Sequence, residues 1–367
     1  MKLAAIVLAI ITGSACSNED ATHFHLHSER SKKAEYVKYA FGSLPGGHSK
    51  NLAWPFQVDS IAHTIGSYQL YPGVKPYFHH GIDLRQDSGT AVYSSTPAKV
   101  VNIENYILGN DLYWEVALLD QDGFIWQYHH IEKQSIPKSI YSALKNGKII
   151  PEGTLLGEIV KWPVFSLGER FDHIHLNILD KDAEYVNPLL FMESLHDQTA
   201  PVIEGITLLD KNPDTRSARD RIRDAFKHGV PKPGQTAPET LLASGDYSIG
   251  VKVYDLINHD VFKVPPYKVS YRINGGKKNT FWKFDKIPGG SDIRAYPEKF
   301  YVRNKTCGDY HCKRMTMNLE FSLKRTPSQE LFPKELGTHE IEINAIDFHG
   351  NSSTRTFIFE VVAKDKK

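Results

Sequence analysis

The sequence predicts a mainly β protein made of two consecutive units. Short runs of β-branched and aromatic residues recur along most of the 367 residues, separated by clusters of Gly, Pro, Asn and Asp. Residues 138–145 form the main predicted helix of the first unit, and Asn146-Gly147 follows as a stop signal. A chain of this length can bury two cores. We therefore expect an antiparallel, barrel-like β domain followed by an immunoglobulin-like β-sandwich.

The first unit, placed at residues 51–196, carries five predicted strands. Each is rich in β-branched or aromatic residues and is bounded by turn residues, which is typical of short antiparallel strands. They are Ala98–Ile103, Leu112–Leu119, Phe124–His130, Leu155–Val160 and His173–Leu179.

The second unit, placed at residues 197–367, carries six alternating runs that predict a β-sandwich. The segment from Asp347 to Asn351 has strong turn chemistry and predicts a hairpin between the last two runs. A charged stretch, 214–227, is predicted as a short helical insertion with no assigned role. The six runs are Val202–Leu208, Tyr247–Tyr254, Tyr267–Ile273, Met315–Phe321, His339–Ala345 and Arg355–Val362.

The first sixteen residues have the pattern of an export signal. Lys2 precedes an apolar run, Leu3–Ile11, that is too short to span a bilayer, and Gly-Ser-Ala precedes Cys16. This ending resembles a lipoprotein signal, which implies lipidation of Cys16; ordinary secretion with cleavage near Ala15 stays open. Residues 17–50 are polar and predict a tether. We expect a protein of the cell envelope, held at the outer membrane and facing the periplasm in a cell with two membranes.

Composition and cysteine usage narrow the possible partners. Lys and Arg number 44 against 43 Asp and Glu, so no charge excess favours nucleic acid, and we expect no such partner. The close pair Cys307 and Cys312 predicts a disulfide in an exported protein. A metal site built on these two thiolates with His311 is the weaker alternative.

Histidine is abundant, with 17 residues, and short clusters of it suggest metal chemistry. His79 and Asp83 lie four apart around a glycine, where a loop would direct both toward one ion. His173 and His175 alternate in a predicted strand and therefore share one sheet face. His130 would approach from another strand. Three ligands from His, Asp or Glu with an open position for water are typical of catalytic zinc.

The order of these motifs resembles the lysostaphin/LytM-type zinc endopeptidases of bacterial cell walls. The resemblance covers about residues 54–192 and implies a duplicated hybrid motif fold. The matching motifs are His79 to Asp83, Gly89-Thr90-Ala91-Val92-Tyr93, Tyr128 to His130, Gly153-Thr154-Leu155-Leu156-Gly157, His173 to His175, and Val186-Asn187-Pro188-Leu189.

The resemblance implies a role for each matched residue. His79, Asp83 and His175 would bind one Zn²⁺ per chain, and His130 and His173 would be the catalytic histidines. His80 and His129 are left outside the site as packed or exposed imidazoles, although a shift of one residue from His130 to His129 remains conceivable. Relatives usually carry a Gly-rich stretch just before the motif that corresponds to His173 to His175, whereas this chain has the bulkier residues 162–172. We therefore expect a bulkier groove rim.

The resemblance further implies hydrolysis of peptide cross-links in peptidoglycan by a metal-activated water. The expected partners are peptidoglycan peptides, the membrane through the lipid anchor, and an envelope protein through the second unit. One alternative is a catalytically silent module that activates another wall hydrolase. Another is a peptidase for glycine-rich protein substrates.

Overall fold

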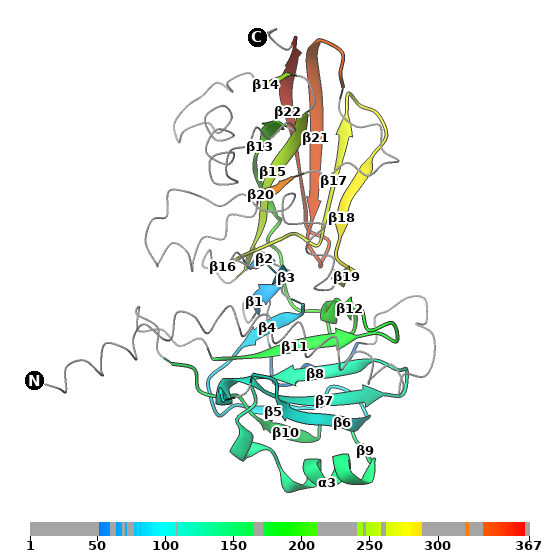
Figure 1. The fold of residues 1–367 in the computed structure, drawn as a ribbon. Helices are drawn as coiled ribbons and strands as arrows, with labels where there is room; N and C mark the ends of the chain where they lie inside the picture. The colour runs from blue at the N-terminus through cyan, green and yellow to red at the C-terminus, as the bar shows by residue number, and fades with distance from the viewer. Residues whose placement is uncertain are drawn as a thin grey trace, which may run out of the picture. The chain divides into compact units, whose positions relative to one another are not determined.

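The computed structural model describes residues 51–58, 64–67, 70–71, 77–78, 80–107, 109–163, 172–210, 241–244, 247–257, 262–287, 320–322 and 333–363 (Figure 1). The chain divides into two compact units, Met1–Leu195 with Asp285–Ile293, and His196–Phe284 with Arg294–Lys367. Several predictions fall outside the described residues. These are the signal and tether with Cys16, the ligand His79, the helical insertion 214–227, and the pair Cys307 and Cys312.

A nine-stranded sheet forms the first unit, and every pairing described in it is antiparallel. Its main path runs β1-β4-β11-β8-β7-β6-β9; β12 pairs with β11, and β19 pairs with β12. The bounds are β1 Thr64–Ser67, β4 Ile82–Arg85, β6 Ala98–Asn105, β7 Trp114–Asp120, β8 Ile125–His129, β9 Ile149–Ile150, β11 His173–Leu179, β12 Tyr185–Val186 and β19 Lys286–Ile287. Two small sheets pair β5 (Ala91–Tyr93) with β10 (Leu155–Glu158) and β2 (Leu70–Tyr71) with β3 (Tyr77–Phe78).

Alternation along the central strands separates an apolar face from a polar face. Because successive strand residues point to opposite sides, the apolar residues of β4, β11, β8 and β7 share one side. That side is solvent-free core: Ile82, Leu84, Val116, Leu118, Trp126, Tyr128, Ile174, Leu176 and Ile178 are 0 % exposed. Except for Ala117, the residues between them are polar, and they carry the chemistry of the site.

The short helical elements agree with the turn signals of the sequence. The helix α3 spans Lys138–Asn146 and ends at Gly147, whose φ of 60° is the left-handed geometry that favours glycine. The one-turn helices are η2 Asp111–Tyr113, η3 Lys133–Ser135 and η4 Pro188–Leu190. The predicted strand from Leu112 was therefore wrong at its start, because Asn110 caps a turn there through its side chain.

The second unit consists of two sheets. One follows the order β13-β15-β16 with β20 beside β15, and the other follows β14-β22-β21-β17-β18. All pairings are antiparallel except β14 with β22. The bounds are β13 Val202–Asp210, β14 Leu241–Ser244, β15 Tyr247–Ile257, β16 Phe262–Val264, β17 Lys268–Ile273, β18 Asn279–Lys283, β20 Glu320–Ser322, β21 Gly337–Ile346 and β22 Ser352–Val362. Each of the six predicted runs overlaps one of these strands, and the immunoglobulin-like topology stays a prediction.

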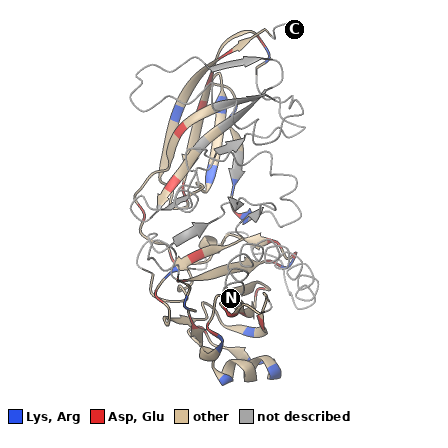
Figure 2. Ribbon diagram, turned by 60° about the vertical axis from the view of Figure 1, so that its left-hand side comes forward, with Lys and Arg blue, Asp and Glu red and all other residues tan. Residues whose placement is uncertain are grey.

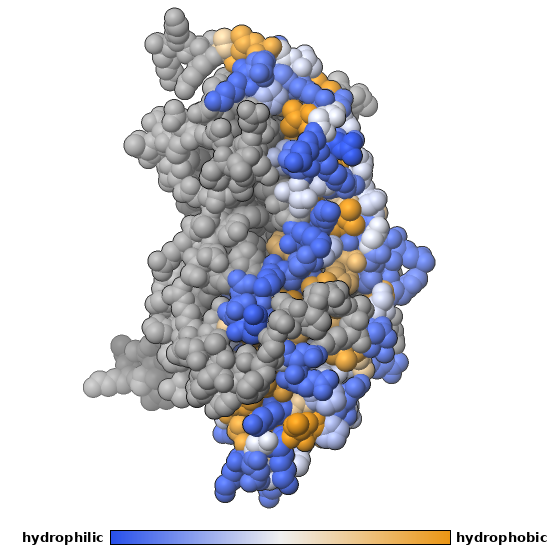
Figure 3. Space-filling model, turned by 90° about the vertical axis from the view of Figure 1, so that its right-hand side faces the viewer, coloured by the Kyte–Doolittle hydropathy of each residue, from blue (hydrophilic) through white to orange (hydrophobic). Residues whose placement is uncertain are grey.

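Charges of both signs are interspersed along the described strands (Figure 2), as the balanced composition predicts. On the face drawn in Figure 3 the coloured residues are mostly hydrophilic, with apolar side chains in small separate groups. Among the described helices, none has the length and hydrophobicity to cross a bilayer.

Candidate metal and catalytic site

Four polar residues form one row across four neighbouring strands of the first unit. The register pairs Asp83 of β4 with His175 of β11, His175 with His129 of β8, and His129 with Glu115 of β7. All four side chains are buried. Directly paired residues in antiparallel strands have neighbouring side chains. The row therefore brings two imidazoles between two carboxylates on a face that water hardly reaches.

His175 is held at both ring nitrogens. Its Nε2 lies 2.7 Å from Asn177 Oδ1, and its Nδ1 lies 2.8 Å from Asp83 Oδ1. An amide oxygen only accepts, so Nε2 carries the hydrogen and donates it to Asn177. In the neutral imidazole the lone pair is then on Nδ1 and points at the Asp83 carboxylate.

This arrangement fits a metal ion. Two acceptor atoms, His175 Nδ1 and Asp83 Oδ1, face each other and need a proton or a cation between them. A neutral imidazole and a carboxylate are ordinary zinc ligands, and a second hydrogen bond that fixes the ring is the usual support of a metal-binding histidine. His79, the third predicted ligand, lies outside the described residues.

His130 immediately follows β8 and has an unusual backbone. Its φ of 68° lies in the left-handed region, which is uncommon for residues other than glycine. Its Nδ1–H donates to the Leu112 carbonyl at 2.7 Å, since a carbonyl only accepts, and Nε2 keeps the lone pair. Burial, with lesser contributions from His173 and His175, holds the pKa of His130 well below its usual range. His130 is therefore a neutral imidazole that can accept a proton at Nε2.

His173 lies between His130, Asp83 and an aromatic residue. Its ring centroid is 4.7 Å from that of His130, and its Nε2 is 3.7 Å from Asp83 Oδ1. Trp162 stacks on His173 with a centroid distance of 5.0 Å and contacts the edge of His130 at the same distance. Trp162 itself is half-buried.

Asp172 anchors the segment that carries Trp162. Its Oδ1 accepts from the Trp162 backbone at 2.7 Å, and its Oδ2 accepts from the Ser88 backbone at 3.3 Å. The sequence indicated bulk in this segment, and the side chains of 164–171 lie outside the described residues. The contact of Trp162 with both histidines was not predicted.

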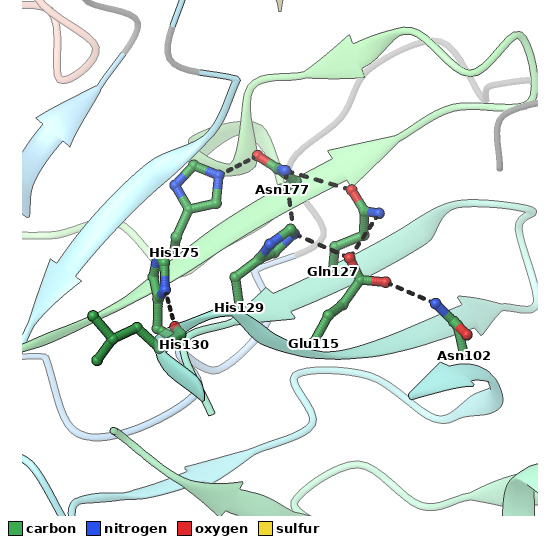
Figure 4. Close-up of polar contacts among 8 residues, drawn as sticks. Asn102, Glu115, Gln127, His129, His130, His175 and Asn177 are labelled. Atoms are coloured by element: carbon green, nitrogen blue, oxygen red, sulfur yellow. Dashed lines mark hydrogen bonds and ion pairs between the residues drawn. The ribbon is translucent and has the colours of Figure 1, made fainter. Parts of the chain in front are cut away.

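Buried polar residues beside the row, Gln127 and Asn177 among them, join its members by hydrogen bonds (Figure 4). Glu115 Oε2 accepts from Gln127 Nε2 at 3.2 Å and lies 3.4 Å from His129 Nε2, and Glu115 Oε1 accepts from Asn102 Nδ2 at 3.3 Å. Asn177 Nδ2 donates to Gln127 Oε1 at 3.4 Å. These contacts connect Glu115 to the hydrogen bond that orients His175. The signal available in the sequence was alternation, because Gln127 and Asn177 each stand between buried apolar residues.

Gly81 allows β4 to approach β11. A Cβ at this position would lie 2.0 Å from the Leu176 carbonyl oxygen and 2.5 Å from Asn177 Oδ1. No side chain fits at such distances, so glycine between His79 and Asp83 is a packing requirement. The expectation of a loop was wrong at Asp83, which is already in strand β4 and is positioned by its pairing with His175.

The two histidines left outside the predicted site differ in their surroundings. His80 is buried and stacks on Tyr185 with a centroid distance of 4.1 Å, as a packed imidazole would. His129 is inside the polar row, 5.1 Å from His175 between ring centroids. His130, rather than His129, contacts His173.

No family model and no curated protein matches the chain. Among solved structures, it is similar to a Pseudomonas aeruginosa protein assigned to peptidase family M23, with 22 % identity over 46 % of this chain and 61 % of that one, and a TM-score of 0.30. A zinc-containing peptidase from Vibrio cholerae is 16 % identical over 37 % of this chain and 37 % of that one, with a TM-score of 0.26. The catalytic domain of the antimicrobial peptidase lysostaphin from Staphylococcus simulans is 16 % identical over 42 % of this chain and 94 % of that one, with a TM-score of 0.23.

The chain thus spans about three fifths of the Pseudomonas aeruginosa protein. At these identities and TM-scores the likenesses do not define an activity. A functional assignment therefore rests on the side chains of the site and on the motifs of the sequence.

Proposed function

We propose that this chain is a zinc-dependent endopeptidase that hydrolyses peptide cross-links of peptidoglycan. The observation that carries the proposal is the convergence of Asp83, His175, His173 and His130 from β4, β11 and the end of β8. The substrate class comes from the motif resemblance to lysostaphin/LytM-type enzymes.

Asp83 and His175 would hold the zinc ion, with His79 as the third ligand that the motif implies. When bound, zinc supplies a Lewis acid that polarises the scissile carbonyl and makes water acidic enough to attack near neutral pH. The hydrogen bond from His175 to Asn177 fixes the imidazole ring and would leave Nδ1 available to hold the ion.

His130 and His173 would handle the protons. His130 accepts at Nε2 the proton that the attacking water loses, because its Nδ1–H is engaged with Leu112. His173, beside it, stabilises the charge that develops on the carbonyl oxygen. As the C–N bond breaks, His130 gives this proton to the leaving amine. The hydroxyl group of the water stays on the acyl carbon as part of the new carboxyl group.

The buried polar residues joined to the row would position His175 rather than react. Glu115, Gln127 and Asn177 are joined by hydrogen bonds, and they act on His175 through the bond that orients its ring. The left-handed backbone at His130 is consistent with a residue constrained for function.

The proposal is tested with purified sacculi. Zinc-loaded protein should release soluble cross-link peptides, and His173→Ala should abolish release while retaining zinc. His80→Ala is the matched control, because His80 packs on Tyr185 away from the row. Zinc-loaded protein that binds sacculi and leaves them uncut would instead indicate the silent, activating module.

We also propose export with a lipid anchor at Cys16, supported by the sequence alone. Cys16→Ser should abolish incorporation of labelled fatty acid and release the protein from membranes. Labelling that persists in this variant would contradict the anchor. The proposed partner of the second unit is an envelope protein, which cross-linking in cells would identify.

A further inference from the structure

Three aspartates from distant parts of the chain meet in the second unit. Asp197 precedes β13, Asp255 lies in β15, and Asp347 directly follows β21. Each places a carboxylate oxygen within 4.8 Å of the other two. These three residues, the aspartate cluster, are far from one another in sequence and meet only through the fold.

The aspartate cluster is buried. Asp255 is 5 % exposed and Asp347 2 %, and the Asp197 side chain is 2 % exposed. Within the described residues, no Lys or Arg pairs with any of the three. The nearest basic group described is His349, whose Nδ1 lies 3.4 Å from Asp197 Oδ2. Buried like charges of this kind are costly unless something neutralises them.

Some of the carboxylate oxygens accept hydrogen bonds from the protein, and two buried ones accept none from the described residues. The Thr199 backbone donates to Asp197 Oδ1 at 2.9 Å, and Asn351 donates to both oxygens of Asp347 at 2.9 and 2.7 Å. In contrast, Asp255 Oδ1 and Asp197 Oδ2 are buried and accept no hydrogen bond from the part of the chain that the structure describes. Buried polar atoms normally have a partner, so unsatisfied oxygens in a preorganised cluster indicate a missing ligand.

A proton on Asp255 would neutralise one of the three carboxylates and leave Asp197 and Asp347. Burial and the neighbouring Asp347 and Asp197 raise the pKa of Asp255 to about 8 in the metal-free protein. A protonated Asp255 would have to donate to an acceptor. Its Oδ1 makes no hydrogen bond with any described residue. A divalent cation accepts lone pairs from all three residues at once and removes their repulsion.

We infer that the aspartate cluster binds one Ca²⁺ ion. The cluster offers carboxylate oxygens, which are the ligands that calcium prefers, and calcium tolerates irregular sets of six to eight oxygens. Zinc favours nitrogen and sulfur ligands, and magnesium requires stricter octahedral geometry. The ion joins the segment before β13, the strand β15 and the β21–β22 turn, so it stabilises the second unit.

Calcium titration of the zinc-loaded full chain tests this inference. Calorimetry with CaCl₂ should give one calcium per chain, and saturating calcium should raise the Tm of the second unit by about 5 °C or more. Binding of zinc or magnesium at the cluster with no response to calcium would overturn the assignment, as would the absence of any binding.

The variant Asp255→Asn separates ion binding from folding. It removes one buried charge at nearly constant size, so the chain should fold and be more stable than wild type in chelator. Calcium should no longer shift its Tm. Glu342→Gln is the control, because Glu342 is an exposed acid of the same unit that pairs with Arg272 at 3.6 Å, and its calcium response should equal that of wild type. A full calcium shift in Asp255→Asn would contradict the site.

Discussion

His175 Nδ1 and Asp83 Oδ1 lie 2.8 Å apart across the pairing of β11 with β4. Both atoms are acceptors, because His175 Nε2 carries the ring hydrogen and donates it in a hydrogen bond to Asn177 Oδ1. The pair therefore has the donor set of half a zinc site, with both groups held by strands rather than by loops. Zinc binding, and with it the proposed hydrolysis, depends on this relationship.

Removal of the acceptor at Asn177 should weaken zinc binding. Asn177→Leu leaves His175 Nε2–H unpaired and frees the ring to change tautomer, and loss of such a supporting hydrogen bond typically costs about 10–100-fold in metal affinity. Asn177→Asp keeps an acceptor and should stay close to wild type. Competition with a chromogenic chelator measures both. An unchanged zinc affinity in Asn177→Leu would show that the hydrogen bond does not orient the ligand.

Loss of the Trp162 ring should lower turnover without changing zinc binding. The ring stacks on His173 and contacts His130, and aromatic pairs of this kind contribute about 0.5–1.5 kcal/mol. Trp162→Ala should therefore reduce kcat/KM up to roughly tenfold, and Trp162→Phe should retain most activity. Steady-state kinetics on a defined cross-linked peptide gives the values. Equal kcat/KM values for wild type and Trp162→Ala would show that Trp162 does not contribute to turnover.

A methyl group at Gly81 should destabilise the first unit. The added Cβ would lie 2.0 Å from the Leu176 carbonyl, and overpacking of this kind costs about 1–3 kcal/mol. Gly205→Ala in β13 is the control, since a Cβ at that position would have no neighbouring atom within 4 Å among the described residues. Thermal unfolding should separate the two variants. A Gly81→Ala protein with the wild-type Tm would mean that β4 and β11 are less closely paired than the structure shows.

In chelator, the second unit should lose stability as the pH rises from about 4 to about 8. The folded-state pKa of Asp255 is about 8, mainly through burial and then through Asp347 and Asp197, whereas an exposed Asp titrates near 3.9. Between these values the folded chain holds a proton that the unfolded chain releases, so the stabilisation present at low pH is lost as the pH rises. Burial raises the pKa of Asp347 in the same direction.

Subtraction of the Asp255→Asn profile isolates this effect from other titrating groups, including His349 beside Asp197. The difference in Tm between the variant and wild type should grow from pH 4 to pH 8 in chelator. A difference that shrinks over this range would contradict the raised pKa.

Local sequence patterns predicted the histidines of the site, whereas the positions of its other polar residues depend on long-range strand pairing. Alternation placed His173 and His175 on one face, and the motif order identified His130. The position of Asp83 inside a strand depends on the register between β4 and β11, which local sequence does not specify. Glu115 and Gln127 resembled ordinary polar strand positions until pairing brought them to His129 and Asn177.

The aspartate cluster also could not be predicted from local sequence. Asp347 was predicted in a turn, and it is buried with Asn351 bonded to its carboxylate. Asp197 and Asp255 carried no motif. Their proximity depends on how β13, β15 and the β21–β22 turn pack, which the spacing of the three residues along the chain does not predict.

The most direct test of the proposed hydrolysis uses ¹⁸O-labelled water and mass spectrometry of the peptides released from purified peptidoglycan. We expect wild type to divide a cross-linked dimer into two peptides, one of which gains a single ¹⁸O in its new carboxylate. His173→Ala should give neither product while binding zinc as wild type does. Release of unlabelled fragments, or labelled products from His173→Ala at the wild-type rate, would contradict the proposed hydrolysis.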